Sequence, residues 1–553
     1  MAGGGNRTSR HTEDWQSLPW KKFQRNVRRL QQRIYRAERR GDWKRVRNLQ
    51  RLLLRSWSAR CLAVRQVTQD NRGKHTAGVD GIASLTPKQR LVLAKTLRKL
   101  SEWTAAPIRR MYIPKPRTTE KRGLGIPVMA DRAMQALVKL ALEPEWEAKL
   151  EPNSYGFRPG RSVHDAIEAI FNAICLKPKY ALDADIEKCF DRISHQALLE
   201  KLNAIQPVTR LVRAWLKAGI VAKGELLYPE AGTPQGGVIS PLLANIALHG
   251  LETALAQAVP RKYKPIVIRY ADDLVILCVN LEVLIKLKAV AEEWLAKMGL
   301  RFKPSKTRFT HTLNEHEGMV GFDFLGFNVR QYQVSKHHTR TYRGKPGFKT
   351  IIQPSKEAIK RHQDKIQGGI RQYRGAPQAA LIATLNPIVR GWAQYYSTCV
   401  AKRTFSTMDY LMSHKLAQWA HYRHPCKTKG WRFRRYWKWQ ATRMNFSDGK
   451  NTLICYADTP IVRHVKVRGD KSPYDGDWLY WSERLGRDPT KPKRVTRLLK
   501  RQEGRCTYCG LRFVAEDTME VHHQDGNRNN NRYTNLALLH AHCHDQTHGK
   551  QCQ

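Results

Sequence analysis

The sequence predicts a multidomain α/β protein, and three observations support that fold class. The chain has 553 residues, a length that corresponds to about three or four domains. Residues 105–330 alternate short apolar runs with helical stretches, the pattern of an α/β fold. Basic, aromatic-rich helical sequence dominates 355–440, and 501–553 is rich in cysteine, histidine and asparagine. These changes divide the chain into five segments: 1–104, 105–330, 331–440, 441–500 and 501–553.

The first segment contains two amphipathic helical patterns. One helical face is formed by apolar residues at three-four spacing: Trp20, Phe23, Val27, Leu30, Ile34 and Ala37. Gly41-Asp42 interrupts the pattern, and a second apolar face follows: Val46, Leu49, Leu52 and Leu53. Lysine and arginine occupy most other positions. The pattern is equally consistent with a helical hairpin that has a solvated basic face and with an RNA-binding surface.

The charge of the chain indicates its class of partner. Lysine and arginine number 98 against 47 acidic residues, a net charge of +51. Residues 431–439 interleave basic and aromatic side chains, which suits phosphate contact combined with base stacking. The alternative is a ribosome-associated or membrane-surface protein. No apolar run approaches the roughly 20 residues of a membrane span, and the N-terminus lacks the apolar core of a signal peptide. We therefore expect nucleic acid as the partner, and no membrane.

Two acidic sites interrupt apolar strands. Asp272 and Asp273 stand within residues 266–278, which otherwise read as a buried β-hairpin, and Asp185 ends another short apolar strand. Buried carboxylates are costly unless a cation compensates them. Two strand-borne acidic sites suit a two-metal phosphoryl-transfer centre, with one ion activating a primer 3′-hydroxyl and the other steadying pyrophosphate. The alternative is a hairpin whose turn is simply Ala-Asp-Asp. Asp183 shares a strand face with Asp185, so spacing alone leaves the choice between them open.

The last segment carries a pattern of metal ligands. Two pairs of zinc-type ligands stand three residues apart and allow a tetrahedral site: Cys506 with Cys509, and His540 with Cys543. The other cysteines are scattered, which indicates a reducing compartment rather than a disulfide framework. Further candidates for chemistry lie between and after these pairs: His522, His523, Asn535, His544 and His548. A purely structural zinc knuckle needs only four ligands, so these additional residues argue against one.

The order of the motifs resembles that of a bacterial-type group II intron-encoded reverse transcriptase/maturase with a C-terminal HNH endonuclease. The resemblance covers essentially the whole chain. It rests on the following segments: 74–82, 109–115, 123–127, 155–162 (YGFRPGRS), 180–191, 232–241 (GTPQGGVISP), 270–273 (YADD), 303–307, 321–327, 385–396 and 501–553.

This resemblance implies a fold for each segment. Residues 1–104 would be a basic helical extension, and 105–330 the fingers and palm of a right-hand polymerase. Residues 331–440 would be an α-helical thumb, or maturase domain X, whose Trp392, Leu416 and Trp419 we expect in the helical core. Residues 441–500 would be a DNA-binding region and linker, and 501–553 a ββα-metal HNH nuclease module with a zinc site.

The resemblance also implies roles in the polymerase. It selects Asp185 over Asp183, because the family's acid precedes isoleucine and stands five residues before an aromatic residue. The implied Mg²⁺ ligands are Asp185, Asp272 and Asp273, with the Ile186 carbonyl. The implied nucleotide contacts are Lys115 and Arg122 to the triphosphate, Gln235 to the incoming nucleotide, and Phe190, which would exclude a 2′-hydroxyl. Gly123 departs from the family's usual proline, so we expect a more flexible fingers tip.

In the nuclease module the resemblance implies two metal sites. Cys506, Cys509, His540 and Cys543 would hold a structural Zn²⁺, although the family commonly has cysteine at position 540. His522, His544 and His548 would hold one catalytic divalent ion. His523 would be the general base, since histidine titrates near neutral pH, and Asn535 would orient the catalytic loop.

The implied function is intron mobility. The protein would bind its group II intron RNA, assist splicing, nick target DNA and extend the new 3′-hydroxyl with deoxynucleotides on an RNA template. We expect a bacterial cytoplasmic, nucleoid-associated ribonucleoprotein, with organelle residence left open. One alternative is a maturase that only chaperones RNA; its acidic triad would be degraded, whereas here it is intact. Another is a non-intron reverse transcriptase of the retron or diversity-generating type, which domain X and the HNH module disfavour.

Overall fold

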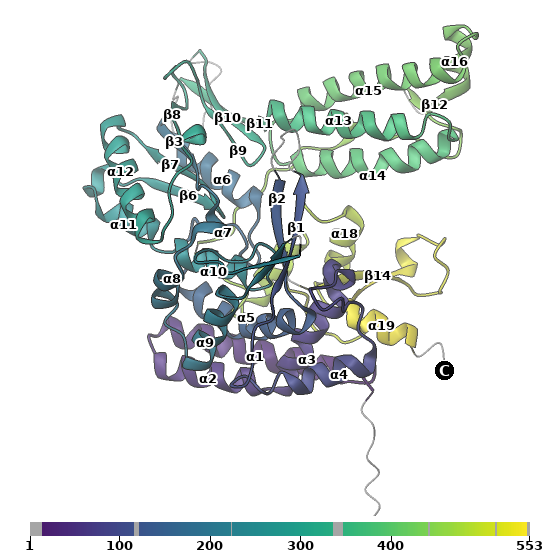
Figure 1. Ribbon diagram of the computed structural model, residues 1–553. Helices are drawn as coiled ribbons and strands as arrows, with labels where there is room; N and C mark the ends of the chain where they lie inside the picture. Colours follow the sequence, from purple (N-terminus) through teal and green to yellow (C-terminus); the bar gives the residue numbers. More distant parts are fainter. Residues whose placement is uncertain are drawn as a thin grey trace, which may run out of the picture.

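A computed structural model describes residues 14–114, 121–222, 224–335, 347–440, 443–469, 471–514 and 517–549 (Figure 1). The architecture mixes helices and strands throughout, as the predicted α/β class requires. No helix in these ranges is both long enough and apolar enough to cross a membrane.

The N-terminal segment folds into four helices: α1 (Trp20–Arg39), α2 (Trp43–Arg55), α3 (Trp57–Arg65) and α4 (Pro87–Thr96). The break predicted at Gly41-Asp42 is confirmed, since Asp42 caps α2 by accepting a hydrogen bond from the Arg45 amide. The prediction for Leu52 is wrong, because this side chain is 52% exposed. Val46, Leu49 and Leu53 follow the three-four spacing of one face, and Leu52 falls outside it.

The next part of the chain contains two four-stranded sheets and the helices around them. Its strands are β1 (Ile108–Pro114), β2 (Lys121–Ile126), β3 (Tyr180–Asp185), β4 (Ile220–Ala222), β5 (Glu225–Leu227), β6 (Ile266–Tyr270), β7 (Asp273–Cys278) and β8 (Arg308–His311). Its helices are α5 (Met129–Lys149), α6 (Val163–Ile174), α7 (Cys189–Arg192), α8 (His195–Leu202), α9 (Gln206–Leu216), α10 (Ser240–Leu248), α11 (Leu251–Gln257) and α12 (Leu281–Lys297). The sheet orders are β2-β1-β4-β5 and β6-β7-β3-β8.

The second of these sheets is buried on both faces. Alternate residues of one strand enter different hydrophobic cores: Leu274 and Ile276 of β7 pack with the N-terminal helices and α8–α12, whereas Val275 and Leu277 pack with α6 and the helices of residues 356–423. Burial on both faces explains why the predicted hairpin reads as a continuous apolar run.

The chain then forms a small sheet and a group of long helices. The sheet contains β9 (Phe322–Phe324), β10 (Phe327–Gln333) and β11 (Phe348–Pro354), and the helices are α13 (Lys356–Gln372), α14 (Gln378–Tyr396), α15 (Lys402–Arg423) and α16 (Lys429–Tyr436). A hairpin of β12 (Trp437–Gln440) and β13 (Arg443–Phe446) follows. Figure 1 shows α13–α16 extending away from the two sheets at the top of the molecule. Leu416 and Trp419 are buried and Trp392 packs against that core, as predicted.

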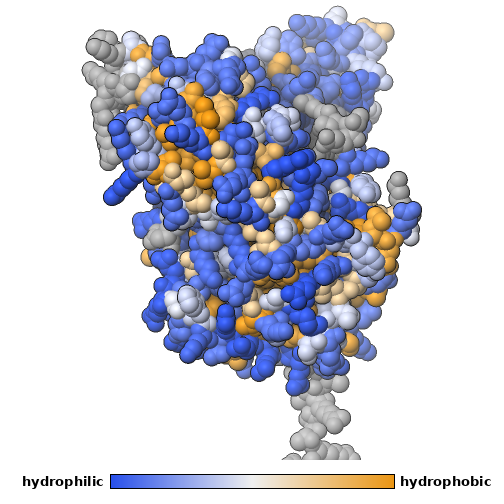
Figure 2. Space-filling view, turned by 60° about the vertical axis from the view of Figure 1, so that its left-hand side comes forward, coloured by the Kyte–Doolittle hydropathy of each residue, from blue (hydrophilic) through white to orange (hydrophobic). Residues whose placement is uncertain are grey.

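The C-terminal part contains α17 (Trp478–Leu485), α18 (Lys493–Arg501), β14 (Met519–His523), β15 (Leu536–His540) and α19 (Ala541–Gly549). It has its own small core, in which Cys506, Cys509 and Cys543 take part. This module lies against the N-terminal helices (Figure 1), where Arg28 of α1 pairs with Asp517 at 2.7 Å. The face in Figure 2 is largely hydrophilic, with smaller hydrophobic patches, as the high net charge leads one to expect.

Candidate functional site

The carboxylates predicted as polymerase ligands meet at one end of the sheet formed by β6, β7, β3 and β8. Asp185 ends β3 and is paired in register with Asp273 at the start of β7, so the two side chains share a sheet face. Asp272 lies in the turn between β6 and β7, where Ala271 has a φ of 57°. The Ile186 amide donates a hydrogen bond of 3.1 Å to the Asp272 carbonyl. The structure thus brings Asp185, Ile186, Asp272 and Asp273 together.

The electrostatics of this cluster suit a bound cation. Burial, together with the charges of Asp272 and Asp185, raises the pKa of Asp273 to about 7. Burial and Asp185 also raise the pKa of Asp272. Lys306 places its Nζ 2.7 Å from Asp185 Oδ2, and its charge favours ionised acids. Sequence reasoning gave Lys306 no role, although it lies in the 303–307 motif. Partly buried carboxylates that repel one another are typical of a Mg²⁺ site, because the charge of a bound ion compensates their repulsion.

Asp183 lies two residues deeper in the same strand. Its partners across the sheet are Val275 and Arg308, whereas the partner of Asp185 is Asp273. Burial and the charge of Asp273 raise the pKa of Asp183 to about 7. The geometry therefore places Asp185 beside the Asp272 turn and Asp183 further from it.

Phe190 lies in α7, directly after the acidic strand. It is buried, and its ring meets the ring of Phe157 edge-on with centroids 6.0 Å apart. Gly232 has a φ of 91°, and a Cβ there would lie 2.7 Å from the Phe190 carbonyl oxygen. A glycine is thus required for the 232–241 loop to pack against α7.

The nucleotide-contact candidates Arg122 and Gln235 touch each other. Arg122 Nε donates to Gln235 Oε1 at 2.8 Å, and the Gln235 carbonyl accepts from the Gly125 amide at 2.6 Å. Gly236 packs directly against the carbonyl of Gly125 in β2. Lys115 lies outside the described residues.

Gly123 accommodates a neighbouring arginine. A Cβ at Gly123 would collide with the guanidinium of Arg110, which crosses the β1–β2 hairpin at this point. Arg110 reaches Asp191, with its Nη2 3.7 Å from a carboxylate oxygen, and Asp191 also accepts a weak hydrogen bond from Gln235. The missing side chain at position 123 thus has a packing reason that the sequence alone did not reveal.

The first candidate metal centre of the C-terminal module consists of four buried residues: Cys506, Cys509, His540 and Cys543. Their ligand atoms lie within 4.8 Å of one another. His540 Nε2 contacts Asp517 Oδ2 at 3.2 Å, which leaves Nδ1 facing the cysteines. A carboxylate behind a ligating histidine is the usual outer-shell support of a zinc site. The donor set and its burial therefore fit Zn²⁺.

The second candidate centre consists of His522 of β14 with His544 and His548 of α19. Their ring nitrogens lie within 4.8 Å of one another, and His522 Nδ1 is buried without a hydrogen-bond partner among the described residues. Glu520, a residue that sequence reasoning missed, lies 2.7 Å from His544 Nδ1 and holds that ring. These features fit a divalent ion bound by imidazole.

His523 and Asn535 lie beside this centre. His523 follows His522 in the strand, so the two side chains leave opposite faces of the hairpin. Asn535 braces the loop between the two strands: its Nδ2 donates to Asp525 at 2.8 Å and to the Asn530 carbonyl at 2.9 Å, and its Oδ1 accepts from the Asp525 amide. Asn535 therefore holds the loop that follows His523.

Four segments of the chain match known protein families. Residues 15–97 match the N-terminal domain of reverse transcriptase, and 113–329 match reverse transcriptase (RNA-dependent DNA polymerase). Residues 359–437 match the group II intron maturase-specific domain, and 506–550 match the HNH endonuclease family.

Individual relatives are also similar. The chain is 30% identical over 329 residues to Protein YkfC of Escherichia coli, which covers 52% of the chain and 83% of that protein. It is 36% identical over 193 residues to the group II intron-encoded protein LtrA of Lactococcus lactis, which covers 34% of the chain and 32% of LtrA. The chain thus aligns with about a third of the length of LtrA. It belongs to the group II intron-encoded proteins, and it joins a reverse transcriptase (an RNA-directed DNA polymerase), a maturase domain and a C-terminal HNH endonuclease.

Proposed function

We propose that this protein carries out target-primed reverse transcription: it nicks one DNA strand and extends the new 3′-hydroxyl on intron RNA. The meeting of Asp185, Asp272 and Asp273 at one sheet end carries the polymerase part of the proposal. The histidine centre of the C-terminal module supports the nicking part. Both lie in one chain, with the nuclease module held against the N-terminal helices.

In the polymerase, which we propose to have a right-hand arrangement, the three aspartates would hold Mg²⁺. Bound Mg²⁺ activates the primer hydroxyl and stabilises the leaving pyrophosphate. Arg122 and Gln235 are placed to orient the incoming nucleotide, and Lys115 would add charge to the triphosphate. Phe190, supported by Phe157, would close the space beneath the sugar and exclude a 2′-hydroxyl.

In the nuclease, which we propose to be of the ββα-metal type, His523 would accept the proton of the attacking water. His522, His544 and His548 would hold the divalent ion, whose charge stabilises the leaving oxygen when it is bound. Asn535 would keep the 524–535 loop in place. Zn²⁺ at Cys506, Cys509, His540 and Cys543 would be structural, since all four positions of a tetrahedron are filled by protein.

The remaining parts of the proposal concern domains and partners. We divide the chain into an extension (1–104), fingers and palm (105–330), thumb (331–440), DNA-binding region (441–500) and nuclease (501–553). The partners would be group II intron RNA, target DNA and a template–primer duplex. We place this ribonucleoprotein in the bacterial cytoplasm, because none of the ten described cysteines forms a disulfide, as is usual in a reducing compartment.

Primer extension on an RNA template tests the polymerase assignment. Asp272→Asn and Asp185→Asn should lower the rate by about 100-fold or more, because metal charge stabilisation contributes several kcal/mol. Asp183→Asn is the matched control, since it removes a carboxylate from the same strand face. The Asp183→Asn variant should retain most of its primer-extension activity. If Asp183→Asn were the only variant to lose activity, the metal site would have to be assigned deeper in the sheet.

A nicking assay tests the nuclease assignment. His523→Ala should abolish cleavage of the DNA strand while primer extension stays at the wild-type rate, because the two centres use different residues. Normal nicking in this variant would place the general base elsewhere. A folded wild-type protein that binds intron RNA but neither nicks nor extends would favour the maturase-only alternative.

A further inference from the structure

A buried arginine stands directly before the acidic turn of the polymerase. Arg269 is the residue before the last in β6, and it is only 3% exposed. It is paired in register with Leu274 of β7, whose side chain enters the hydrophobic core. Residues paired in this way share a sheet face, so the guanidinium of Arg269 lies on the core side of the sheet. None of the roles proposed above uses this side chain.

The charge of Arg269 is not neutralised by a contact with an acid. Glu151 and Glu252 line a small cavity beside it, but Glu151 accepts a hydrogen bond from the Thr253 amide and Glu252 accepts one from Asn153. Neither carboxylate forms an ion pair with Arg269 in the described part of the chain. Burial lowers the pKa of Arg269 to about 10, and the charge of Glu151 acts in the opposite direction. A buried charge is costly unless it is hydrogen-bonded, so the partners of the guanidinium matter.

The guanidinium joins three segments of the chain. Its Nη1 donates to the Ala271 carbonyl at 3.2 Å and to Asn245 Oδ1 at 3.1 Å. Its Nη2 donates to Ser154 Oγ at 2.6 Å. These acceptors belong to the turn after β6, to α10 and to the loop that precedes α6. Arginine suits this arrangement because its donors form a planar fork of fixed geometry, whereas a lysine ammonium is a compact point charge.

The contact with Ala271 bears directly on Asp272. The Ala271 carbonyl belongs to the peptide that joins Ala271 to Asp272, and Arg269 holds that carbonyl. The Asp272 carbonyl, on the other side of the same Cα, accepts from the Ile186 amide at 3.1 Å. Because each peptide is planar, holding both carbonyls restricts φ and ψ of Asp272. The direction in which its carboxylate leaves the backbone is thereby fixed.

The conformation of the turn depends on such contacts. Ala271 has a φ of 57°, a left-handed conformation that residues with a Cβ rarely adopt. Conformations of this kind persist where the surrounding structure enforces them. Gly156 also touches the turn, since a Cβ there would lie 2.3 Å from the Ala271 amide nitrogen. Asn245 donates to the Gly156 carbonyl at 2.8 Å, so it holds both this loop and the guanidinium of Arg269.

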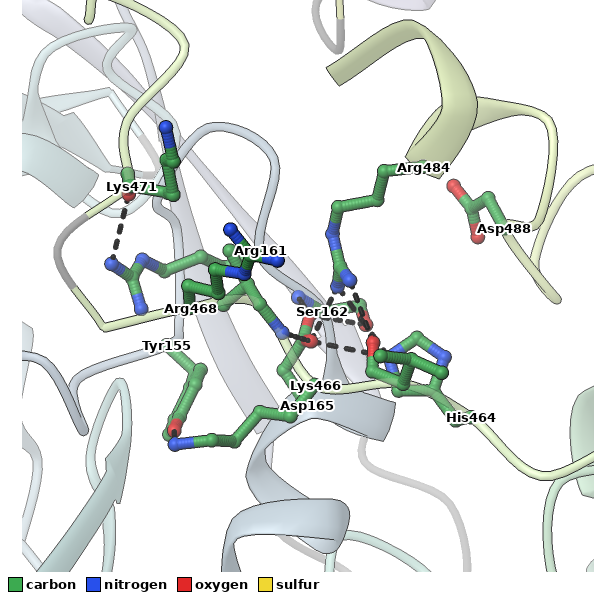
Figure 3. A network of polar contacts seen from close by, with 12 residues as sticks. Tyr155, Arg161, Ser162, Asp165, His464, Lys466, Arg468, Lys471, Arg484 and Asp488 are labelled. Atoms are coloured by element: carbon green, nitrogen blue, oxygen red, sulfur yellow. Dashed lines mark hydrogen bonds and ion pairs between the residues drawn. The ribbon is translucent and has the colours of Figure 1, made fainter. Parts of the chain in front are cut away.

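The loop that carries Ser154 and Gly156 is itself anchored (Figure 3). Tyr155, which stands between these two residues in the sequence, is fully buried. Arg161 lies over its ring, 5.7 Å from the centroid, and Lys466 places its Nζ 3.5 Å from the Tyr155 hydroxyl. An anchored loop gives the Ser154 hydroxyl a fixed place, from which it can hold the guanidinium.

We propose that Arg269 is a positioning residue of the polymerase: it fixes the peptide before Asp272 and thereby holds that carboxylate in the acidic cluster. This inference rests on the proposed role of Asp272 as a ligand of Mg²⁺. The guanidinium lies in the core, so it acts through Asp272 and not by touching substrate. Because Mg²⁺ demands near-ideal octahedral geometry, a displaced carboxylate should weaken metal binding more than nucleotide binding.

Primer extension by the full-length protein tests the proposal with Arg269→Lys, which keeps the charge and removes the fork. The matched control is Arg132→Lys. Arg132 is also buried, and burial lowers its pKa as well. Its guanidinium bonds three backbone carbonyls, all of them outside the acidic turn: those of Gly73, Thr76 and Pro127. Both variants therefore lose a buried guanidinium with several acceptors, and only one of them loses a contact with the turn.

The Mg²⁺ concentration for half-maximal activity should rise about tenfold in Arg269→Lys, because support behind metal ligands is typically worth about 10–100-fold in metal affinity or activity. At sub-saturating Mg²⁺, kcat should fall by a similar factor while the KM for deoxynucleotides stays within about twofold. Excess Mg²⁺ should restore most of the rate. Arg132→Lys should leave the Mg²⁺ requirement unchanged. A wild-type requirement in folded Arg269→Lys, or the same rise in both variants, would overturn the proposal.

Ser154→Ala provides a milder variant, which loses only the hydroxyl that accepts from Arg269 Nη2. The half-maximal Mg²⁺ concentration should rise about threefold, the effect of losing one hydrogen bond of ordinary strength. This variant decides the question if Arg269→Lys does not fold. A wild-type Mg²⁺ requirement in Ser154→Ala would then show that Arg269 serves folding alone, and the positioning role would be refuted.

Hydrogen exchange in the absence of metal separates this inference from the polymerase assignment. The Ile186 amide, which bonds the Asp272 carbonyl, should exchange about tenfold faster in Arg269→Lys than in the wild type. Arg132→Lys should not change this rate. If Asp272→Asn extends primers normally, the proposed role of Asp272 fails, and faster exchange would still show that Arg269 holds the turn. If Asp272→Asn is inactive while Arg269→Lys keeps the wild-type exchange rate and Mg²⁺ requirement, the positioning role fails alone.

Discussion

Gly123 shows how a single absent side chain changes the contacts at the edge of a polymerase site. Arg110 crosses the hairpin over this glycine and reaches Asp191, which also contacts Gln235. The guanidinium is the far end of a flexible side chain, so it can move at little cost. A side chain introduced at position 123 should therefore change nucleotide binding more than the stability of the fold.

Gly123→Ala should displace Arg110 and raise the KM for deoxynucleotides several-fold, because Asp191 would then repel the triphosphate. The melting temperature should barely change, since a partly exposed ion pair contributes about 0–1 kcal/mol. Steady-state primer extension measures this. Arg110→Met should raise KM by a similar factor; a wild-type KM in Gly123→Ala would show that Arg110 has no part in nucleotide binding.

Cys506 belongs to a module whose core is small. Cys506→Ser should release zinc and unfold the 505–549 region, because a structural zinc site supplies folding free energy directly. Zinc content and limited proteolysis measure the two effects, while primer extension should persist. Cys426→Ser is the control, since Cys426 is exposed and outside the cluster. Full zinc content in Cys506→Ser would refute the assigned ligand set.

At the scale of elements, the segment 462–468 depends on α6 rather than on hydrogen bonds of its own. Asp165 binds His464, Val467 and Arg484, while Glu168, one turn later in α6, binds Arg463 at 2.7 Å. The first set is buried and the second is more exposed. Similar pairs should therefore differ in their contribution to stability.

Asp165→Asn should destabilise this segment by about 3–5 kcal/mol, because it leaves the Arg484 charge without its buried partner. Glu168→Gln should cost about 1 kcal/mol or less. Hydrogen exchange at the Val467 amide measures both. Equal protection in the two variants would contradict the assigned role of Asp165.

The lowered pKa of Asp165 also predicts a pH dependence of the same segment. A carboxyl whose pKa is lower in the folded state contributes stability above its unfolded pKa of about 3.9, and this contribution is lost as pH falls below that value. Protection of the Val467 amide in the wild type should therefore decrease below about pH 4. Asp165→Asn should lack this transition, and its persistence would point to another group.

At the scale of the whole molecule, the N-terminal helices hold the nuclease. Arg28 donates to both oxygens of Asp517 at 3.0 and 2.7 Å and to the Arg512 carbonyl, and Asp517 in turn contacts His540. A second pair joins Arg65 to Asp545 at 2.8 Å. His540, the proposed zinc ligand, is thus oriented through a residue that is held by the opposite end of the chain.

Arg28→Met should therefore speed zinc release to a chelator about tenfold, because loss of outer-shell support typically weakens metal binding by about 10–100-fold. Arg29→Met is the control, since the neighbouring Arg29 is exposed. Hydrogen exchange around Asp517 should rise in the first variant only. Identical zinc-release rates in both variants would show that docking and zinc retention are independent.

The predictions that succeeded from sequence were local ones. The first helix and the hairpin around Asp272 each depend on residues within a few positions of one another. The roles of Lys306, Glu520 and Arg110 were not predicted. Each of them depends on a partner in another element, and lysine, glutamate and arginine are too common in this chain for their type to be informative.

The sequence by itself determined the α/β class, because periodicity encodes it, and the order of the polymerase, maturase and nuclease parts, because motifs that resemble one family stand in that order along the chain. Only the tertiary structure decided that Asp185 faces Asp273, that Asp165 holds the segment 462–468, and that Arg28 supports the nuclease. Those contacts join residues far apart in the chain, and burial and register, which no local pattern specifies, decide which of many charged residues meet.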